Sequence, residues 1–226
     1  MTEGTGGTVP GGAAFGEAPL AQTVAVAGAI RRLTSVLLSL EQPHPTVEAM
    51  VGQFADWERE LAAAAPRDPA PRIGSDSDDE RRVYLDHATD IGAYNPCFPE
   101  YSFDRLDDGN GAGTVRFPLV YEGPPGLVHG GFLGVFFDCV VQHHNCVTGL
   151  SGKTRSLTVT FRRPTPVLTD LRFDITRSPV ERAVVSTARL LRDDEVLCTG
   201  EVNTAASRPD QLSTTQFGRR RKESGS

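Results

Sequence analysis

The segment from residue 130 to residue 145, GGFLGVFFDCVVQHHN, constrains the fold of this chain more than any other. Large apolar side chains cover nearly the whole circumference of a helix built on it: Phe132, Leu133, Val135, Phe136, Phe137, Val140 and Val141. Both faces of such a helix must be buried, and one sheet can cover only one of them. We therefore expect the other face to meet a second protein surface, most simply the same helix in a second copy of the chain.

Apolar and polar residues alternate with a period of two on both sides of this helix, as in strands packed on one face. The stretch before the helix is GTVRFPLVY, residues 113–121. The stretches after it are joined by short turns: 156–161, 171–178, 182–191 and 196–204. One strand, a long helix and four further strands predict an antiparallel sheet with an inserted helix, which is an α+β domain.

The remainder of the chain divides by composition. Residues 1–19 are rich in glycine and small residues and predict a disordered N-terminus, and we expect the same of the C-terminal tail, 208–226. Two amphipathic stripes separated by QPHPT predict a helical hairpin over 20–64. Residues 65–86 are rich in proline and then in acidic residues, as in a linker. The sheet domain is therefore expected over 87–207.

Composition argues against several classes of function. The formal net charge is −6, and the only dense basic run is GRRRKE at 218–223, so we expect no nucleic-acid partner. No apolar stretch approaches the ~18 residues needed to cross a bilayer, and the first residues do not resemble a signal peptide, so we expect a soluble, cytoplasmic protein. The cysteines lack CxxC spacing, and His143 and His144 point about 100° apart on a helix. A disulfide framework or a metal site is therefore not expected.

Asp138 is the single acid in the apolar helix, and a carboxylate there is costly unless it is hydrogen-bonded or protonated. It could be a structural residue that a neighbouring threonine or backbone amide satisfies, or one that faces solvent near the helix end. It could also be the acid of a reaction site. Gly130 and Gly131 favour the second interpretation, because amides at the start of a helix can bind a substrate oxygen.

The spacing within this helix bears on how such a site is built. Nine residues separate His129 from Asp138, which corresponds to roughly 13 Å along a helix axis. The amides and the acid of one chain therefore cannot act on the same atom. If two copies of the helix run antiparallel across a twofold axis, the amides of one copy approach Asp138 of the other.

Three features together resemble the hotdog-fold acyl-CoA thioesterases of the phenylacetate-degradation type: EGPPGLVHGG at 122–131, Asp138, and TRSLTVTFRRPTP at 154–166. The resemblance covers about residues 95–206. It implies a long helix wrapped by a curved antiparallel sheet, here with an N-terminal helical extension, in a homodimer or a dimer of dimers. It also implies hydrolysis of an acyl-CoA thioester without a metal or a tightly bound cofactor.

The resemblance assigns catalytic roles residue by residue. Asp138 matches the general base or nucleophile, and Gly130 matches the residue whose amide polarises the thioester carbonyl. His129 matches a histidine that orients the thioester and shapes the turn. Thr154 matches a hydroxyl that holds the water or the acid. Cys139 stands where a second carboxylate is common in near relatives, so the chain departs from the pattern there.

Further residues are candidates for substrate binding. Gly131 follows Gly130 at the helix start, and Glu122 lies where some relatives have Asn or Gln. Arg162 and Arg163 could meet the phosphates of coenzyme A, although solvation at the surface explains them about as well. Two other functions stay open: a hotdog-type enoyl-CoA hydratase or dehydratase, and a non-catalytic acyl-CoA-binding or scaffold protein.

Overall fold

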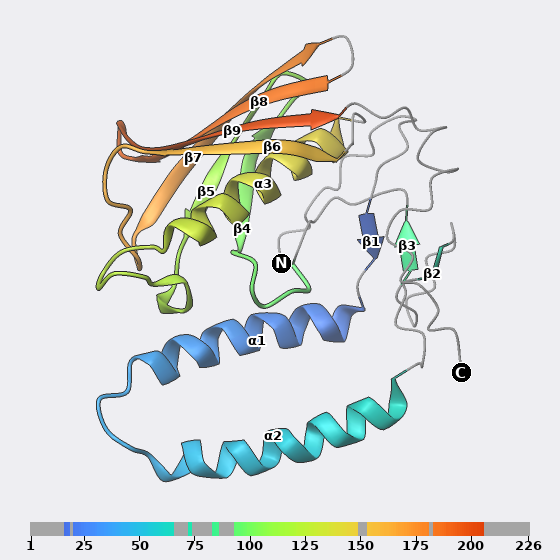
Figure 1. Cartoon of the computed structure of the whole chain (residues 1–226), viewed down its shortest axis with the longest axis vertical. Coiled ribbons are helices and arrows are strands. Elements are labelled where there is room, and N and C mark those ends of the chain that lie inside the picture. The colour runs from blue at the N-terminus through green and yellow to red at the C-terminus, as the bar shows by residue number, and fades with distance from the viewer. Residues whose placement is uncertain are drawn as a thin grey trace, which may run out of the picture.

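The computed structural model describes residues 16–18, 20–65, 72–73, 83–85, 93–148, 153–180 and 183–205. Its main feature is a six-stranded antiparallel sheet in the order β4-β5-β7-β8-β9-β6, and helix α3 (Gly130–Val147) lies along one face of it (Figure 1). The strands are β4 (Tyr101–Leu106), β5 (Asn110–Arg116), β6 (Thr154–Phe161), β7 (Asp170–Val180), β8 (Ala183–Arg192) and β9 (Glu195–Ala205). The architecture confirms the predicted α+β class.

The core lies between α3 and the concave face of the sheet, because the period-two strands turn their apolar side chains towards the helix. In β7, Leu171, Phe173 and Ile175 are buried. Phe136 at the centre of α3 is fully buried and packs edge-on against three aromatic rings: Tyr101, Phe117 and Phe173. Such perpendicular ring pairs are favoured over face-to-face stacks.

The strands at the start of the domain differ from the prediction in two ways. The strand predicted over 113–121 ends at Arg116, and a short 3-10 helix η1 (Leu119–Tyr121) follows, with Pro118 at its N-cap. Proline cannot donate to a sheet ladder, so the apparent alternation through Tyr121 was misleading. Strand β4 was not predicted, because a bulge between Phe103 and Arg105 breaks its period of two.

Two helices occupy the stretches that were predicted to form a hairpin. They are α1 (Ala21–Leu38) and α2 (Pro45–Ala64), the two long helices below the sheet in Figure 1. Helix α1 contacts η1, and α2 has no buried residue. Apolar side chains of α2 are largely exposed: Val51, Phe54, Trp57 and Leu61. No helix in the described ranges has both the length and the apolar character that a membrane crossing requires.

A small sheet lies where the sequence predicted no regular structure. Strands β1 (Gly16–Ala18), β3 (Val83–Leu85) and β2 (Arg72–Ile73) pair in that order. These segments belong to the predicted disordered N-terminus and linker, and runs of two or three residues are too short to show a period. Residues 1–15 and 206–226, which include the predicted C-terminal tail, lie outside the described residues.

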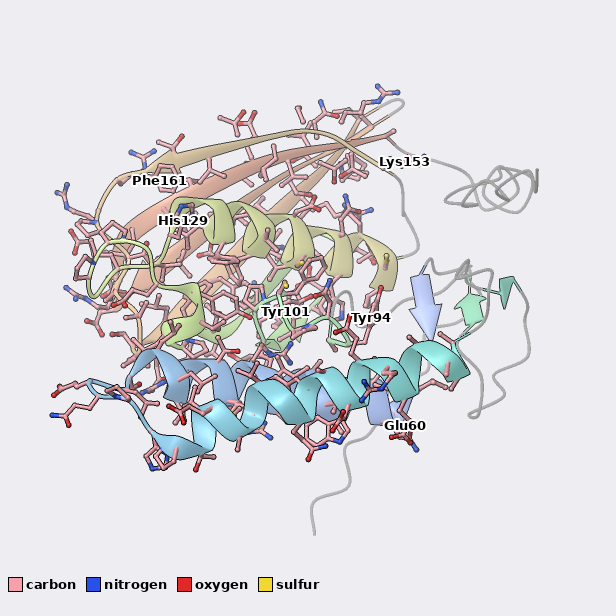
Figure 2. The ribbon with its side chains drawn as sticks, turned by 60° about the horizontal axis from the view of Figure 1, so that its bottom comes forward. Glu60, Tyr94, Tyr101, His129, Lys153 and Phe161 are labelled. Carbon is pink, nitrogen blue, oxygen red and sulfur yellow. The ribbon has the colours of Figure 1, made fainter. Side chains whose placement is uncertain are left out.

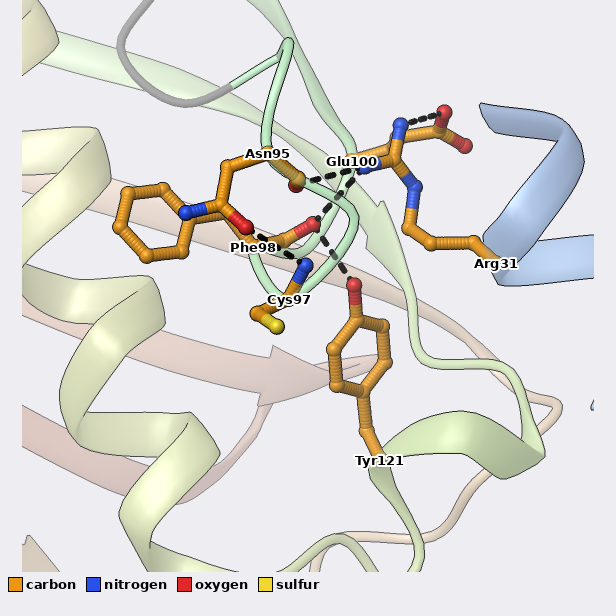
Figure 3. Close-up of polar contacts among 6 residues, drawn as sticks. All are labelled: Arg31, Asn95, Cys97, Phe98, Glu100 and Tyr121. Atoms are coloured by element: carbon orange, nitrogen blue, oxygen red, sulfur yellow. Dashed lines mark hydrogen bonds and ion pairs between the residues drawn. The ribbon is translucent and has the colours of Figure 1, made fainter. Parts of the chain in front are cut away.

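Arg31 attaches α1 to the sheet domain (Figure 3). Its buried guanidinium donates to the carbonyl oxygens of Asn95 at 2.9 Å and Phe98 at 3.4 Å, and it pairs with the Glu100 carboxylate. The Tyr121 hydroxyl donates to the same Phe98 carbonyl at 2.6 Å. The loop 95–100 is therefore held between α1 and η1, and these contacts fix the orientation of the helix.

Replacing Arg31 by methionine is expected to loosen α1, because hydrogen bonds that involve a charged group contribute roughly 1.5–3 kcal/mol each. Amide hydrogen exchange in α1 should speed up, while exchange in α3 stays unchanged. Arg32→Met is the matched control, since the Arg32 side chain makes no hydrogen bond or ion pair within the described part of the chain. Equal exchange in the two variants would contradict the assigned role of Arg31.

Candidate active site

The N-terminus of α3 is capped by its own histidine. His129 accepts a hydrogen bond at Nδ1 from the Gly131 amide at 3.0 Å, and its own amide donates to the Tyr121 carbonyl at 2.9 Å. The proton of a neutral His129 ring is then on Nε2, since Nδ1 is an acceptor. The Gly130 amide meets no acceptor in the described part of the chain.

This geometry corrects the expectation that both glycine amides are open to a substrate. The Gly131 amide is already bound by His129, because a side chain at the N-cap reaches the second amide of the helix. One free donor, that of Gly130, is left to bind an oxygen. His129 therefore holds the turn through its Nδ1 atom.

Phe161 lies beside the candidate site, and the sequence did not reveal it. Figure 2 shows it at the same end of α3 as His129, and its side chain is 58% exposed. A methyl group added at Gly130 would lie 3.0 Å from its Cζ atom, so the ring of Phe161 adjoins Gly130. Its place as the last residue of β6, opposite an apolar helix, was the only available signal.

Asp138 lies two turns further along α3 and is half-buried. The Thr154 hydroxyl, at the start of β6, donates to its Oδ1 atom at 2.6 Å. Asp138 and Thr154 are therefore brought together. About 12 Å of helix separates Asp138 from Gly130, so one chain does not bring the acid and the free amide together.

The structure adds Gln142 to this pair. Its Nε2 atom donates to the Thr154 hydroxyl at 2.5 Å and to the Thr204 hydroxyl at 3.1 Å. Gln142 follows Asp138 by four residues, so both face the same side of the helix. That spacing of two polar residues in an apolar helix was visible in the sequence, but Thr204 on β9 could not be placed without the sheet.

The other substrate-binding candidates have structural partners. Glu122 accepts a hydrogen bond from the Gly126 amide at 2.6 Å and so closes the GPPG turn, in which Gly126 adopts a positive φ of 79°. Arg163 donates to Glu195 at 2.9 Å, and Arg162 donates to the Thr199 hydroxyl at 3.3 Å. Both arginines are exposed. Arg163 has a carboxylate partner among the described residues, and Arg162 has none there.

Comparison with known proteins shows which fold this geometry belongs to. No family model matches the sequence, and no curated protein matches it significantly. The crystal structure of a thioesterase superfamily protein, however, matches with a TM-score of 0.64 and 26% sequence identity, over 81% of this chain and 94% of that chain. The chain has the hotdog fold of thioesterase superfamily proteins. The match extends beyond the hotdog domain, because residues 93–205 cannot provide 81% of the chain.

Other solved structures match about half of this chain. A thioesterase from Ralstonia eutropha, related to phenylacetic acid degradation, is 21% identical with a TM-score of 0.43, over 47% of this chain and 84% of that one. A thioesterase from Streptococcus pneumoniae, solved with coenzyme A, is 16% identical with a TM-score of 0.47, over 50% of this chain and 89% of that one.

The two histidines near the end of α3 are held in different directions within the hotdog domain. His143 meets the Tyr101 hydroxyl through Nδ1 at 3.2 Å, and His144 meets the Asp107 carbonyl through Nε2 at 2.6 Å. The described residues contain no group of three His, Cys, Asp or Glu side chains placed to hold a metal ion. Burial lowers the pKa of His143 to about 4, aided by repulsion from His144, and burial also lowers the pKa of His144.

The lowered pKa values of these two histidines predict that acid lowers the free energy of unfolding of the hotdog domain. In the unfolded chain they take up protons near the ordinary pKa of 6.5, whereas the folded chain resists protonation until about pH 4 at His143. The unfolded state therefore binds more protons between these values, and the free energy of unfolding falls as the pH drops from about 6.5 towards 4. Urea titrations across this pH range should show the fall in the free energy of unfolding, and His143→Gln should make that fall smaller. If the free energy of unfolding of that variant depends on pH as it does in the wild type, His143 is excluded as a source of the acid sensitivity.

Proposed function

We propose that the protein hydrolyses an acyl-CoA thioester, with a fatty or aryl acyl group, to the free acid and coenzyme A. The observation that carries this proposal is the half-buried Asp138, held at Oδ1 by the Thr154 hydroxyl at 2.6 Å. Its other oxygen makes no hydrogen bond within the described part of the chain. A fixed carboxylate with one oxygen available is suited to bind and activate a water molecule. The similarity to a thioesterase superfamily protein supports the same chemistry.

In the proposed reaction, Asp138 takes a proton from water while the water oxygen attacks the thioester carbon. The carbonyl oxygen becomes an oxyanion, which the free Gly130 amide at the positive end of α3 in a second copy of the chain stabilises. The carbon–sulfur bond then breaks, and the proton held by Asp138 passes to the leaving thiolate. Phe161 beside Gly130 supplies an apolar surface for the acyl group.

The reaction centre is proposed to be shared between two copies of the chain, in a homodimer or a dimer of dimers. The separation of about 12 Å along α3 supports this, since Gly130 and Asp138 of one chain cannot reach the same thioester. Among the described residues, strand β6 ends the sheet and pairs only with β9, so its other edge is available for antiparallel pairing with a second β6. Such pairing would bring two α3 helices together with opposite directions.

Release of free thiol from a panel of saturated acyl-CoA and arylacetyl-CoA thioesters tests the proposal. Turnover of at least one saturated substrate is expected, because hydrolysis needs no double bond. Addition of water to an enoyl-CoA without thiol release would support a hydratase instead. Binding of acyl-CoA without any reaction would support a non-catalytic acyl-CoA-binding protein. Either result would replace the proposed function.

A further inference from the structure

A line of polar side chains crosses the core from Asp138 to a buried arginine. Asp138, Gln142 and Asn145 lie on one stripe of α3, at spacings of four and three residues, and this stripe faces β6 and β9. Asn145 and Thr204 are fully buried, and Arg177 on β7 is 6% exposed. Buried polar groups of this kind are retained only when hydrogen bonds satisfy them, so the direction of each bond is informative.

The arginine end fixes the orientation of Asn145. Arg177 donates through Nε to Asn145 Oδ1 at 3.0 Å, and a guanidinium can only donate. The amide of Asn145 therefore turns its Nδ2 group towards Thr204, whose hydroxyl oxygen it meets at 3.4 Å. Arg177 also donates through Nη1 to the Asp108 carbonyl at 2.8 Å, so its guanidinium is held at two points.

The carboxylate end fixes the orientation of Gln142. Thr154 has one hydroxyl proton, and that proton is directed to Asp138 at 2.6 Å. The Thr154 oxygen can then only accept, so the group it meets at 2.5 Å must be the Nε2 donor of Gln142 and not its oxygen. The same Nε2 group donates its second proton to Thr204 at 3.1 Å. Both amide protons of Gln142 are therefore used.

We propose that Gln142 is a positioning residue that acts on Asp138 through Thr154. By donating to the Thr154 oxygen, it holds that hydroxyl in the orientation that gives its only proton to Asp138. The carboxylate is then fixed at Oδ1 and keeps its other oxygen for the water. Gln142 does not itself touch the reacting atoms. The inference rests on the proposed thioesterase function and adds to its site a residue that acts through another side chain.

Three substitutions test this role by steady-state kinetics: Gln142→Met, Gln142→Glu and Thr154→Val. Gln142→Met is expected to lower kcat roughly tenfold with little change in KM, the size expected for one hydrogen bond to a charged network. Gln142→Glu is nearly isosteric but replaces a donor by a second carboxylate. It should move the acidic limb of the pH–rate profile to higher pH, which a purely structural defect would not do. Gln53→Met on the exposed face of α2 is the matched control.

The double variant Gln142→Met with Thr154→Val separates action through Thr154 from an independent effect. If Gln142 acts through Thr154, the double variant should be no slower than Thr154→Val alone, since the second change removes nothing further. Losses that multiply would overturn the inference. Wild-type kcat and an unmoved acidic limb in both Gln142 variants would also overturn it, while leaving the thioesterase proposal intact.

A measurement without substrate keeps the two proposals distinguishable. In nitrogen-15 NMR spectra, Thr154→Val should shift the Gln142 side-chain amide signals and speed their exchange with water, because one acceptor is lost. Unchanged Gln142 signals would overturn the inference whatever the activity. Absence of thiol release by the wild type, in contrast, would overturn the proposed function, and with it the positioning role of Gln142.

Discussion

Asp138→Asn is expected to lower kcat for thioester hydrolysis by roughly 10²–10⁴-fold, the usual contribution of a general base. Asparagine cannot take the proton of the attacking water at neutral pH. Its amide oxygen can still accept the Thr154 hydroxyl, which the carboxylate holds at 2.6 Å, so the packing around α3 should survive. Thiol release measured with saturating acyl-CoA, together with the urea midpoint, would separate an effect on catalysis from an effect on stability.

Asp104→Asn provides the matched control for this experiment. Asp104 is exposed on β4 and makes no hydrogen bond or ion pair within the described part of the chain, so its amide variant should keep wild-type kcat. Wild-type turnover in Asp138→Asn would refute the role of the acid. A collapse of folding in that variant would show that Asp138 is primarily structural.

Gly113→Ala is expected to cost about 3 kcal/mol or more in the free energy of unfolding, at the upper end of the range for overpacked cores. A Cβ atom at this position would lie 2.0 Å from the Ser102 carbonyl oxygen and 2.6 Å from Phe173 Cζ. The first neighbour is backbone of the paired strand β4, so a rotamer change cannot relieve the clash. Strand β4 and the loop that Arg31 holds should therefore become less stable.

The comparison variant is Gly52→Ala, made in the middle of α2. No atom lies within 4 Å of an added Cβ there, and alanine is favoured over glycine in a helix by about 1 kcal/mol. Denaturant unfolding followed by circular dichroism would compare the two. Similar midpoints for both variants would mean that β5 and β4 are not as closely paired as described.

Much of the fold was predictable where one period extends over many residues. Helix α3 and strands β6 to β9 follow one pattern over most of their length, and their predicted positions are confirmed to within a few residues. The prediction failed where a local event breaks the period. The bulge after Phe103 concealed β4, and Pro118 ended a strand whose apolar residues continue to alternate through Tyr121 in a 3-10 helix.

The candidate site was predictable in its residue types but not in its connections. Asp138 is conspicuous as one acid in an apolar helix, and the pairing with Thr154 came from the family resemblance. The capping of Gly131 by His129 and the use of Glu122 to close a turn depend on rotamers, which a linear pattern does not specify. Gln142 was overlooked because its partners, Thr154 and Thr204, lie on β6 and β9, which only the sheet topology makes neighbours.

The loop held by Arg31 has a practical consequence. Cys97 in this loop is exposed, whereas Cys139, Cys146 and Cys198 are buried, and burial raises the pKa of the Cys198 thiol to about 11. A maleimide dye should therefore attach at one place per polypeptide without mutagenesis. The emission of the dye would report on release of helix α1 from this loop. Energy transfer between labelled copies would measure the distance between chains in an assembly.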